Sequence, residues 1–366
     1  MASIRKRSKQ DGGGYQVRYY GPDGRPRAST FRSKREAIDF SNTVESDIAR
    51  GSWLDPNLAS KPLHEVIDAY LRSSMHWRPS TRLKVEGHVR NYIIPAFGDY
   101  PIGQVRPSDV RDWVVALTEH GLSPGTVRGV YSSLSRIMKQ AVIDGLIARS
   151  PCFGIALPQD AAQREMHFLE PAQIEALACE VSERYRTLIF TAAYTGLRWG
   201  ELAALKVKSL DLVKGSITVT EAVAEVNGYL REGRTKTGAI RTVALPPFLR
   251  HMLSEHIVRF PSKDYVFTSA KGRPMRKNFY RREFVPAVQR ARLMNGLRFH
   301  DLRHTCAALL IAQGAHPKEI QNRLGHSTIR VTFDRYGHLF PSLDERLRDG
   351  LEKMYREGKK SHPSGS

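Results

Sequence analysis

The chain has 366 residues, which is enough for two or three domains with cores of their own. Lys and Arg total 57 against 37 Asp and Glu, and the formal charge of +20 indicates a polyanionic partner, because neutralised phosphates release counterions. No apolar run reaches the ~18 residues of a membrane span. Cys152, Cys179 and Cys306 are too few and too far apart for a zinc motif or a disulfide framework, which favours a reducing, cytoplasmic location.

Residues 1–58 are predicted to form a small basic unit. The segments 15–20 and 27–31 alternate like strands around a turn at 21–24, and a helix is expected from Lys34 to about Ala49, stopped by Gly51. Such a basic β-ribbon fits a DNA major groove, although a solvated basic surface remains the alternative. The residues proposed to contact DNA are Arg5, Arg7, Arg18 and Arg27.

Residues 59–160 show a helical pattern throughout. Apolar residues recur at helical spacing after Leu63, and Ser123 followed by Pro124 has the chemistry of a helix start. We therefore expect a bundle of four or five helices. The candidate phosphate contacts in this domain each also fit an ordinary surface charge. They are Arg78, Arg82, Lys84, Arg90, Arg128, Arg136 and Lys139, of which Arg82, Arg128 and Lys139 are the residues proposed to contact DNA.

Residues 161–366 are predicted to form a larger, mostly helical domain with some strands. Strands are expected at 216–220, 241–245 and 265–267, and Lys236 falls on a tight turn between the first two. Beyond Pro341 a final helix is expected to carry an apolar stripe suited to assembly with another subunit or to packing on its own domain. Its members are Leu343, Leu347, Leu351 and Met354.

A set of polar residues in this last domain has the chemistry needed to break a phosphodiester without a metal ion. Arg198 and Arg303 would meet the negative charge on the phosphate oxygens, since each guanidinium donates two parallel hydrogen bonds. Tyr336 would be the nucleophile, and its phenol needs a proton acceptor because its ordinary pKa is about 10. His300 is the expected acceptor, Lys236 the donor to the leaving 5′ oxygen, and His326 a hydrogen-bond donor to phosphate.

These residues lie in local sequences that resemble the tyrosine recombinase family, in its phage integrase branch, as found in mycobacteriophages and other actinophages. The matching stretches are 195–202 (TGLRWGEL), 236–238 (KTG), 300–304 (HDLRH), 324–327 (LGHS) and 334–336 (DRY). The resemblance implies that Arg198, Lys236, His300, Arg303 and His326 assist Tyr336, with Glu201 supporting the arginines. It also likens residues 1–58 to an arm-binding domain, 59–160 to a core-binding domain and 161–366 to the catalytic domain.

The resemblance implies site-specific recombination through a 3′-phosphotyrosine, without metal, ATP or other cofactor. The partners it implies are double-stranded DNA with core-type and arm-type attachment sites, three further copies in a homotetramer, a host DNA-bending protein and a directionality factor. The fold it implies is mainly helical and multidomain, with a small N-terminal β-sheet and a mixed α/β catalytic domain. The enzyme would act on the nucleoid in the cytoplasm of a bacterial host.

Other readings remain open at the level of sequence. His300 and His304 are spaced like the histidines of a zinc hydrolase helix, but Arg303 would set a fixed positive charge between them. A non-catalytic DNA-binding protein of the same fold, a resolvase and a type IB topoisomerase-like enzyme are further alternatives.

Overall fold

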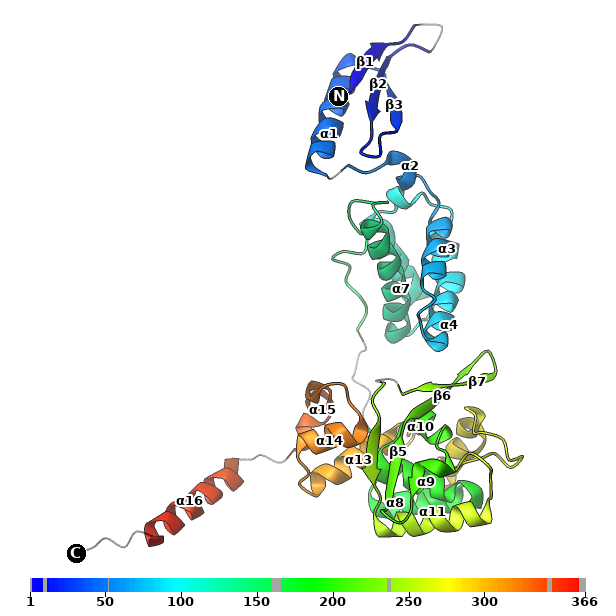
Figure 1. Ribbon diagram of the computed structural model, residues 1–366, viewed down its shortest axis with the longest axis vertical. Coiled ribbons are helices and arrows are strands. Elements are labelled where there is room, and N and C mark those ends of the chain that lie inside the picture. The colour runs from blue at the N-terminus through cyan, green and yellow to red at the C-terminus, as the bar shows by residue number, and fades with distance from the viewer. Residues whose placement is uncertain are drawn as a thin grey trace, which may run out of the picture. The chain divides into compact units, whose positions relative to one another are not determined.

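The computed structural model describes residues 2–8, 12–51, 53–159, 166–235, 238–340 and 344–361. The chain separates into two compact units, Met1–Gln163 and Arg164–Ser366, each with its own hydrophobic core (Figure 1). The mainly helical, multidomain fold predicted from the sequence is confirmed. The further division of the first unit at residue 58 stays a prediction.

The N-terminal part of the first unit is an antiparallel sheet with one helix. Its strands lie in the order β1 (Ser3–Lys6), β2 (Tyr15–Tyr20), β3 (Pro26–Phe31), and α1 (Lys34–Arg50) packs on them. Val17 and Tyr19 from β2 meet Ala37 and Val44 from the helix in a small buried core. Two strands and the helix were predicted, and Gly51 ends the helix in the left-handed conformation as expected. Strand β1 was not predicted.

The rest of the first unit is helical, as predicted. Its helices are α2 (Pro56–Ala59), α3 (Leu63–Ser73), α4 (Pro79–His88), a π-helical turn η1 (Val89–Ile93), α5 (Ile94–Phe97), a 3-10 turn η2 (Ile102–Gln104), α6 (Pro107–Glu119) and α7 (Pro124–Ile143). The apolar faces of α3 and α7 bury Ile67, Leu134 and Ile137 in a common core. Ser123 caps α7 by accepting a hydrogen bond from the Thr126 amide.

The second unit combines helices with two separate small sheets. Its helices are α8 (Pro171–Glu180), α9 (Glu183–Thr195), α10 (Trp199–Ala203), η3 (Val207–Ser209), α11 (Pro247–Arg259), η4 (Tyr280–Phe284), α12 (Val285–Arg290), α13 (Asp301–Ala312), α14 (Pro317–Leu324), α15 (Ile329–Tyr336) and η5 (Gly337–Leu339). One sheet has the order β4 (Leu210–Asp211), β5 (Ser216–Val219), β8 (Arg241–Ala244), and the other is the hairpin β6 (Glu221–Val226), β7 (Tyr229–Arg234). The strands β5 and β8 were predicted.

The strand predicted at 265–267 is wrong. Only an isolated bridge joins Tyr265 to Lys206 there. Val266 and Phe267 are each 1% exposed, so the apolar run that suggested a strand reflects their burial in the core of the second unit.

The last helix, α16 (Asp344–Ser361), carries exposed apolar side chains. Leu351 and Met354 of the predicted stripe are 65% and 68% exposed, while Leu343 and the side chain of Leu347 lie outside the described part. Within the described ranges, no helix is both long and apolar enough to cross a lipid bilayer.

Candidate active site

The first arginine is placed by a break between two helices. Gly196 ends α9 with φ 67°, and a Cβ at this position would lie 2.4 Å from Leu324 Cδ2, so a side chain there would clash. The chain then turns directly into α10, with Arg198 as the residue that precedes its first turn.

Glu201 holds Arg198 in place, as the sequence predicted. One Glu201 oxygen accepts from the Arg198 amide at 2.9 Å, and the other accepts from Arg198 Nη1 at 2.8 Å. Arg198 Nη2 donates to the Gly325 carbonyl at 2.9 Å. The contact is confirmed, whereas its part in catalysis stays a prediction.

A third arginine, which the sequence analysis missed, completes this network. Arg241 from β8 donates through Nη2 and Nη1 to both oxygens of Glu201, at 2.6 and 3.1 Å, and through Nε to the Arg323 carbonyl at 2.9 Å. The Glu201 side chain is only 1% exposed. Burial opposes its charged form, but Arg241 and Arg198 outweigh that effect and keep the pKa of Glu201 below its ordinary value.

The second predicted arginine, Arg303, lies in the first turn of α13 and is 3% exposed. Its Nη1 and Nη2 donate to the carbonyls of Gly196 and Leu324, both at 2.6 Å. Leu324 and Gly325 are consecutive, so neighbouring carbonyls hold Arg303 and Arg198 side by side. Burial and the charge of Arg198 lower the pKa of Arg303 to about 9, as expected where two cations share one space.

The residue that hydrogen-bonds Tyr336 differs from the expected one. His304 Nδ1 lies 2.9 Å from the Tyr336 hydroxyl, with the two rings edge to face. His300, which was expected to be this partner, is exposed and lies one helical turn away, with its ring 5.0 Å from that of His304. The sequence offered a signal, because His304 belongs to the same HDLRH stretch.

Of the two remaining predicted residues, the structure describes His326 and leaves Lys236 outside the described ranges. His326 follows the end of α14 at Gly325, its ring stacks 6.3 Å from that of Tyr336, and its Nδ1 lies 2.9 Å from Thr332 Oγ1. Lys236 lies outside the described residues, so its predicted role is untested. In the part of the chain that the structure describes, no three metal-binding side chains gather into a cluster.

The site keeps its tyrosine protonated and its histidines neutral. Tyr336 is 0% exposed, and burial raises its pKa to about 12, although Arg303 pulls the pKa downward. Burial lowers the pKa of His304 to about 4 and that of His326 to about 3, with Arg303 adding to both shifts. His300 is shifted in the same direction, but its solvent exposure screens the effect. At neutral pH these histidines are proton acceptors.

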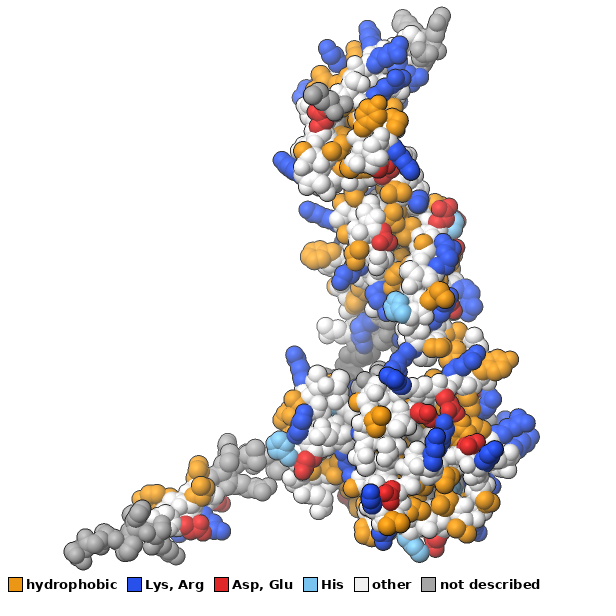
Figure 2. Space-filling view, viewed as in Figure 1, with side chains coloured by type: hydrophobic (Ala, Val, Ile, Leu, Met, Phe, Trp, Pro, Cys, Tyr) orange, Lys and Arg blue, Asp and Glu red, His pale blue; other side chains and the backbone are white. Residues whose placement is uncertain are grey.

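The residues proposed to contact DNA from the first unit are partly engaged elsewhere. Arg27 pairs with Asp23 at 2.7 Å and with Asp55 at 2.5 Å, and Arg82 pairs with Glu86 at 2.7 Å. Arg128 Nη1 donates to the Pro158 carbonyl at 2.7 Å. The exposed residues are Arg5, Arg18 and Lys139, and Arg7 is half-buried. Lys and Arg side chains are spread over both units on the face shown in Figure 2.

A basic hollow lies between α4 and α7, and two of its residues, Lys84 and Arg136, are among the candidate phosphate contacts named from the sequence. It has a volume of about 500 Å³ and is lined by Ser80, Thr81, Lys84, Val85, His88, Gly129, Ser132 and Arg136. Burial, followed by the charges of Lys84 and Arg136, lowers the pKa of His88. None of these lining residues is acidic, so the hollow suits an anion.

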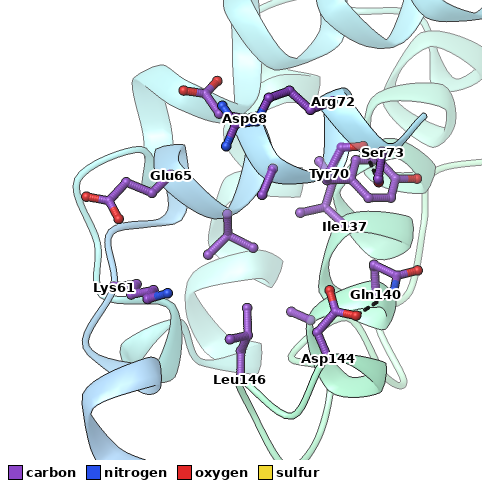
Figure 3. A pocket seen from close by; sticks show the side chains of 13 residues that line it. Lys61, Glu65, Asp68, Tyr70, Arg72, Ser73, Ile137, Gln140, Asp144 and Leu146 are labelled. Carbon is purple, nitrogen blue, oxygen red and sulfur yellow. Dashed lines mark hydrogen bonds between the residues drawn. The ribbon is translucent and has the colours of Figure 1, made fainter. Parts of the chain in front are cut away.

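A second hollow in the same unit is lined by both acidic and basic residues. It lies between α3 and α7 and has a volume of about 650 Å³ (Figure 3). Apolar residues such as Ile137 and Leu146 form its floor, while Glu65, Asp68 and Asp144 stand around it with Lys61 and Arg72. Its mixed charge makes it a poor site for a polyanion.

The chain is similar in sequence to known integrases. Residues 167–342 match the model of the phage integrase family, and residues 63–118 match the phage integrase N-terminal SAM-like domain. The integrase of Mycobacterium phage D29 is 30% identical over 276 residues, covering 73% of this chain and 72% of that protein. The integrase of Mycobacterium phage L5 is 28% identical over 363 residues, covering 94% and 92% of the two chains.

The fold is also found in solved structures. The Tn1549 transposon integrase in complex with a circular intermediate DNA aligns with a TM-score of 0.71 at 23% identity, over 80% of this chain and all of that one. The lambda integrase tetramer bound to a Holliday junction aligns with a TM-score of 0.60 at 19% identity, over 89% and 95% of the two chains. With the buried tyrosine and its arginines in place, we conclude that the chain belongs to the phage integrase family of tyrosine recombinases, which carry out site-specific DNA recombination.

Proposed function

We propose that Tyr336 Oη attacks the scissile phosphorus of an attachment site, so that a tyrosyl O–P bond forms while the P–O5′ bond breaks. The products are a 3′-phosphotyrosine and a free 5′ hydroxyl, and the partner strand's hydroxyl reverses the step without ATP. The observation that carries this proposal is the hydroxyl of Tyr336, 2.9 Å from His304 Nδ1, in a site that also holds Arg198 and Arg303.

His304 takes the phenolic proton in this proposal. A phenol whose pKa is about 12 is a weak nucleophile at neutral pH, and the neutral imidazole is within hydrogen-bonding distance. This replaces the role expected of His300, which instead lines the exposed side of the site, where it can donate to phosphate.

The arginines stabilise the charge of the transition state. The carbonyls of Gly196, Leu324 and Gly325 use only part of the donors on Arg303 and Arg198, because each guanidinium has five N–H groups. The remaining donors can bind the non-bridging oxygens, in a site made electropositive before DNA arrives. His326 contributes a further hydrogen bond, and Lys236 gives its proton to the leaving 5′ oxygen.

Complete burial of Tyr336 requires a movement before cleavage. A phosphate must approach Oη within bonding distance, yet this side chain is 0% exposed. We propose that DNA binding shifts α15, which carries Tyr336 as its last residue, so that the phenol reaches the phosphate while the arginines stay fixed.

The partners follow from the division of the chain. We propose that residues 1–58 bind arm-type sites, that residues 59–160 and 161–366 each bind core-type sites, and that four copies assemble on DNA. The tetrameric lambda integrase on a Holliday junction supports this assembly. The exposed apolar residues of α16 would join neighbouring copies. A host DNA-bending protein and a directionality factor would assist on the nucleoid, in the bacterial cytoplasm.

The test is to trap the covalent intermediate. The duplex carries the core attachment site and a nick, placed so that the short fragment with the free 5′ hydroxyl diffuses away after cleavage. It should accumulate a protein–DNA adduct that survives denaturation and forms in excess chelator. Tyr336→Phe should bind the duplex and form no adduct. An adduct that persists in this variant would refute the assignment, and binding without any adduct in the parent would favour a non-catalytic DNA-binding protein. A resolvase or a type IB topoisomerase-like enzyme would form the adduct, but would fail to join phage and bacterial attachment sites.

A further inference from the structure

A hollow of about 700 Å³ lies directly beside the catalytic residues within the second unit. It is lined by Trp199, Glu225, Lys277, Asn278, Phe279, Tyr280, Arg281, Arg298, Phe299 and His300. His300 forms one side, and Trp199 is the residue directly after Arg198. The hollow therefore begins where the catalytic site ends.

The floor of the hollow is aromatic. Trp199 stacks on Phe279, with ring centres 5.4 Å apart and planes 14° from parallel. Phe299 meets both rings edge to face, at 5.0 and 5.8 Å. Phe279 and Phe299 are 4% and 8% exposed, so the core holds them rigidly, and the half-buried Trp199 that they support offers an apolar surface to a sugar or a base.

The rim carries two cations that the protein does not use for its own stability. Lys277 and Arg281 are exposed, and in the described ranges no ion pair or hydrogen bond involves either side chain. Arg298, by contrast, is held by Asp301 at 2.7 Å. Glu225 accepts a hydrogen bond from the Lys277 amide at 3.3 Å and pairs with Arg276 at 3.5 Å, so Arg276 already neutralises its negative charge.

We propose that this hollow binds the nucleotide next to the scissile phosphate, with its sugar and base edge on the aromatic floor and its phosphate between Lys277 and Arg281. The inference rests on the proposed cleavage at Tyr336. A DNA strand carries one phosphate about every 3.4 Å along its axis, so a strand held at His300 must place its next nucleotide within reach of this hollow. Neither the aromatic floor nor these two cations has another part in the catalytic site described above.

The experiment tests whether one DNA phosphate contacts the side chains of Lys277 and Arg281. A core-site duplex, read from the repeats that flank the integrated element, carries a single neutral methylphosphonate at one of the three positions on either side of the scissile phosphate. Affinity is measured by fluorescence anisotropy with the full-length Tyr336→Phe protein, so that cleavage does not interfere. We expect one position to weaken binding by about tenfold, the size of one charged hydrogen bond.

The double substitution Lys277→Met, Arg281→Met should make that same methylphosphonate cost less than about twofold, because the contact is already lost. A matched control is Lys271→Met, Arg273→Met, which removes the same charge from exposed residues outside the hollow and should leave the tenfold effect intact. If the methylphosphonate at every position weakens binding by the double variant as much as it weakens binding by the parent, the proposal is wrong. Because binding is measured with cleavage blocked, failure of the covalent chemistry would appear in the adduct assay and not here.

Discussion

His304 Nδ1 and the Tyr336 hydroxyl are joined by a 2.9 Å contact in the buried core of the catalytic unit. We predict that His304→Gln slows adduct formation by at least about a hundredfold, the usual worth of a general base. Burial lowers the pKa of His304 to about 4, so the parent's pH–rate profile should fall on the acid side near that value. This acid limb should be absent in His304→Gln. His300→Gln should keep that limb. Single-turnover cleavage at saturating DNA measures both, and a His304→Gln protein that cleaves like the parent would remove His304 from the chemistry.

Acid should destabilise the catalytic unit before its carboxylates titrate. His304 and His326 have folded-state pKa values of about 4 and about 3, below the ordinary 6.5, so between these values the unfolded chain binds more protons. Stability is therefore fully present above about pH 6.5 and is lost as the pH falls through that range, by on the order of 1–3 kcal/mol per histidine. Urea unfolding from pH 7 to pH 4 measures this slope. In His326→Asn the slope should become shallower, and an unchanged slope would contradict the buried neutral state.

Arg241 should act through Glu201 and not through DNA. Replacing Arg241 with Met leaves a buried carboxylate with one cation in place of two, and should cost about 3 kcal/mol of stability. Cleavage should slow with little change in DNA affinity, because Arg198 loses its fixed orientation. Arg241→Lys should recover part of the rate. In a double-mutant cycle with Glu201→Gln the two losses should be strongly non-additive, and simple additivity would rule out this positioning role.

Lys84 and Arg136, which line the basic hollow between α4 and α7, should bind phosphate more directly than Arg82. Lys84→Ala and Arg136→Ala should each lower the slope of log affinity against log salt by about 1, the loss expected for one phosphate contact. Arg82→Ala, whose guanidinium is paired with Glu86, should change the slope little. Filter binding from low to moderate salt distinguishes them. Equal slopes for all three variants would place the DNA elsewhere.

Removal of α16 should affect assembly and spare recognition. A chain truncated after Phe340 loses the exposed Leu351 and Met354. It should bind a single core site with parental affinity but fail to form the synaptic complex on two sites, as seen by analytical ultracentrifugation. Leu351→Ser, Met354→Ser in the full chain should behave alike if these side chains make the contact. Parental recombination by the truncated chain would show that α16 has another role.

The sequence alone determined the local structure and the chemistry of the chain. The Ser123 hydroxyl caps the start of α7 and the Gly51 backbone caps the end of α1, each through hydrogen bonds to residues close in sequence, so both helix ends were predictable. Arg198, Arg303 and Tyr336 were found because each lies in a short stretch with its own pattern, and the contact of Glu201 with Arg198 spans only three residues.

Tertiary structure decided which of these groups meet. His300 and His304 lie one turn apart in the same stretch, and only the packing of α13 with the α14–α15 segment sets His304 against Tyr336. Arg241 reaches Glu201 across 40 residues of sequence, and the three aromatic rings beside His300 come from three separate segments. Such contacts depend on how distant elements pack in a common core, and no local pattern records that packing.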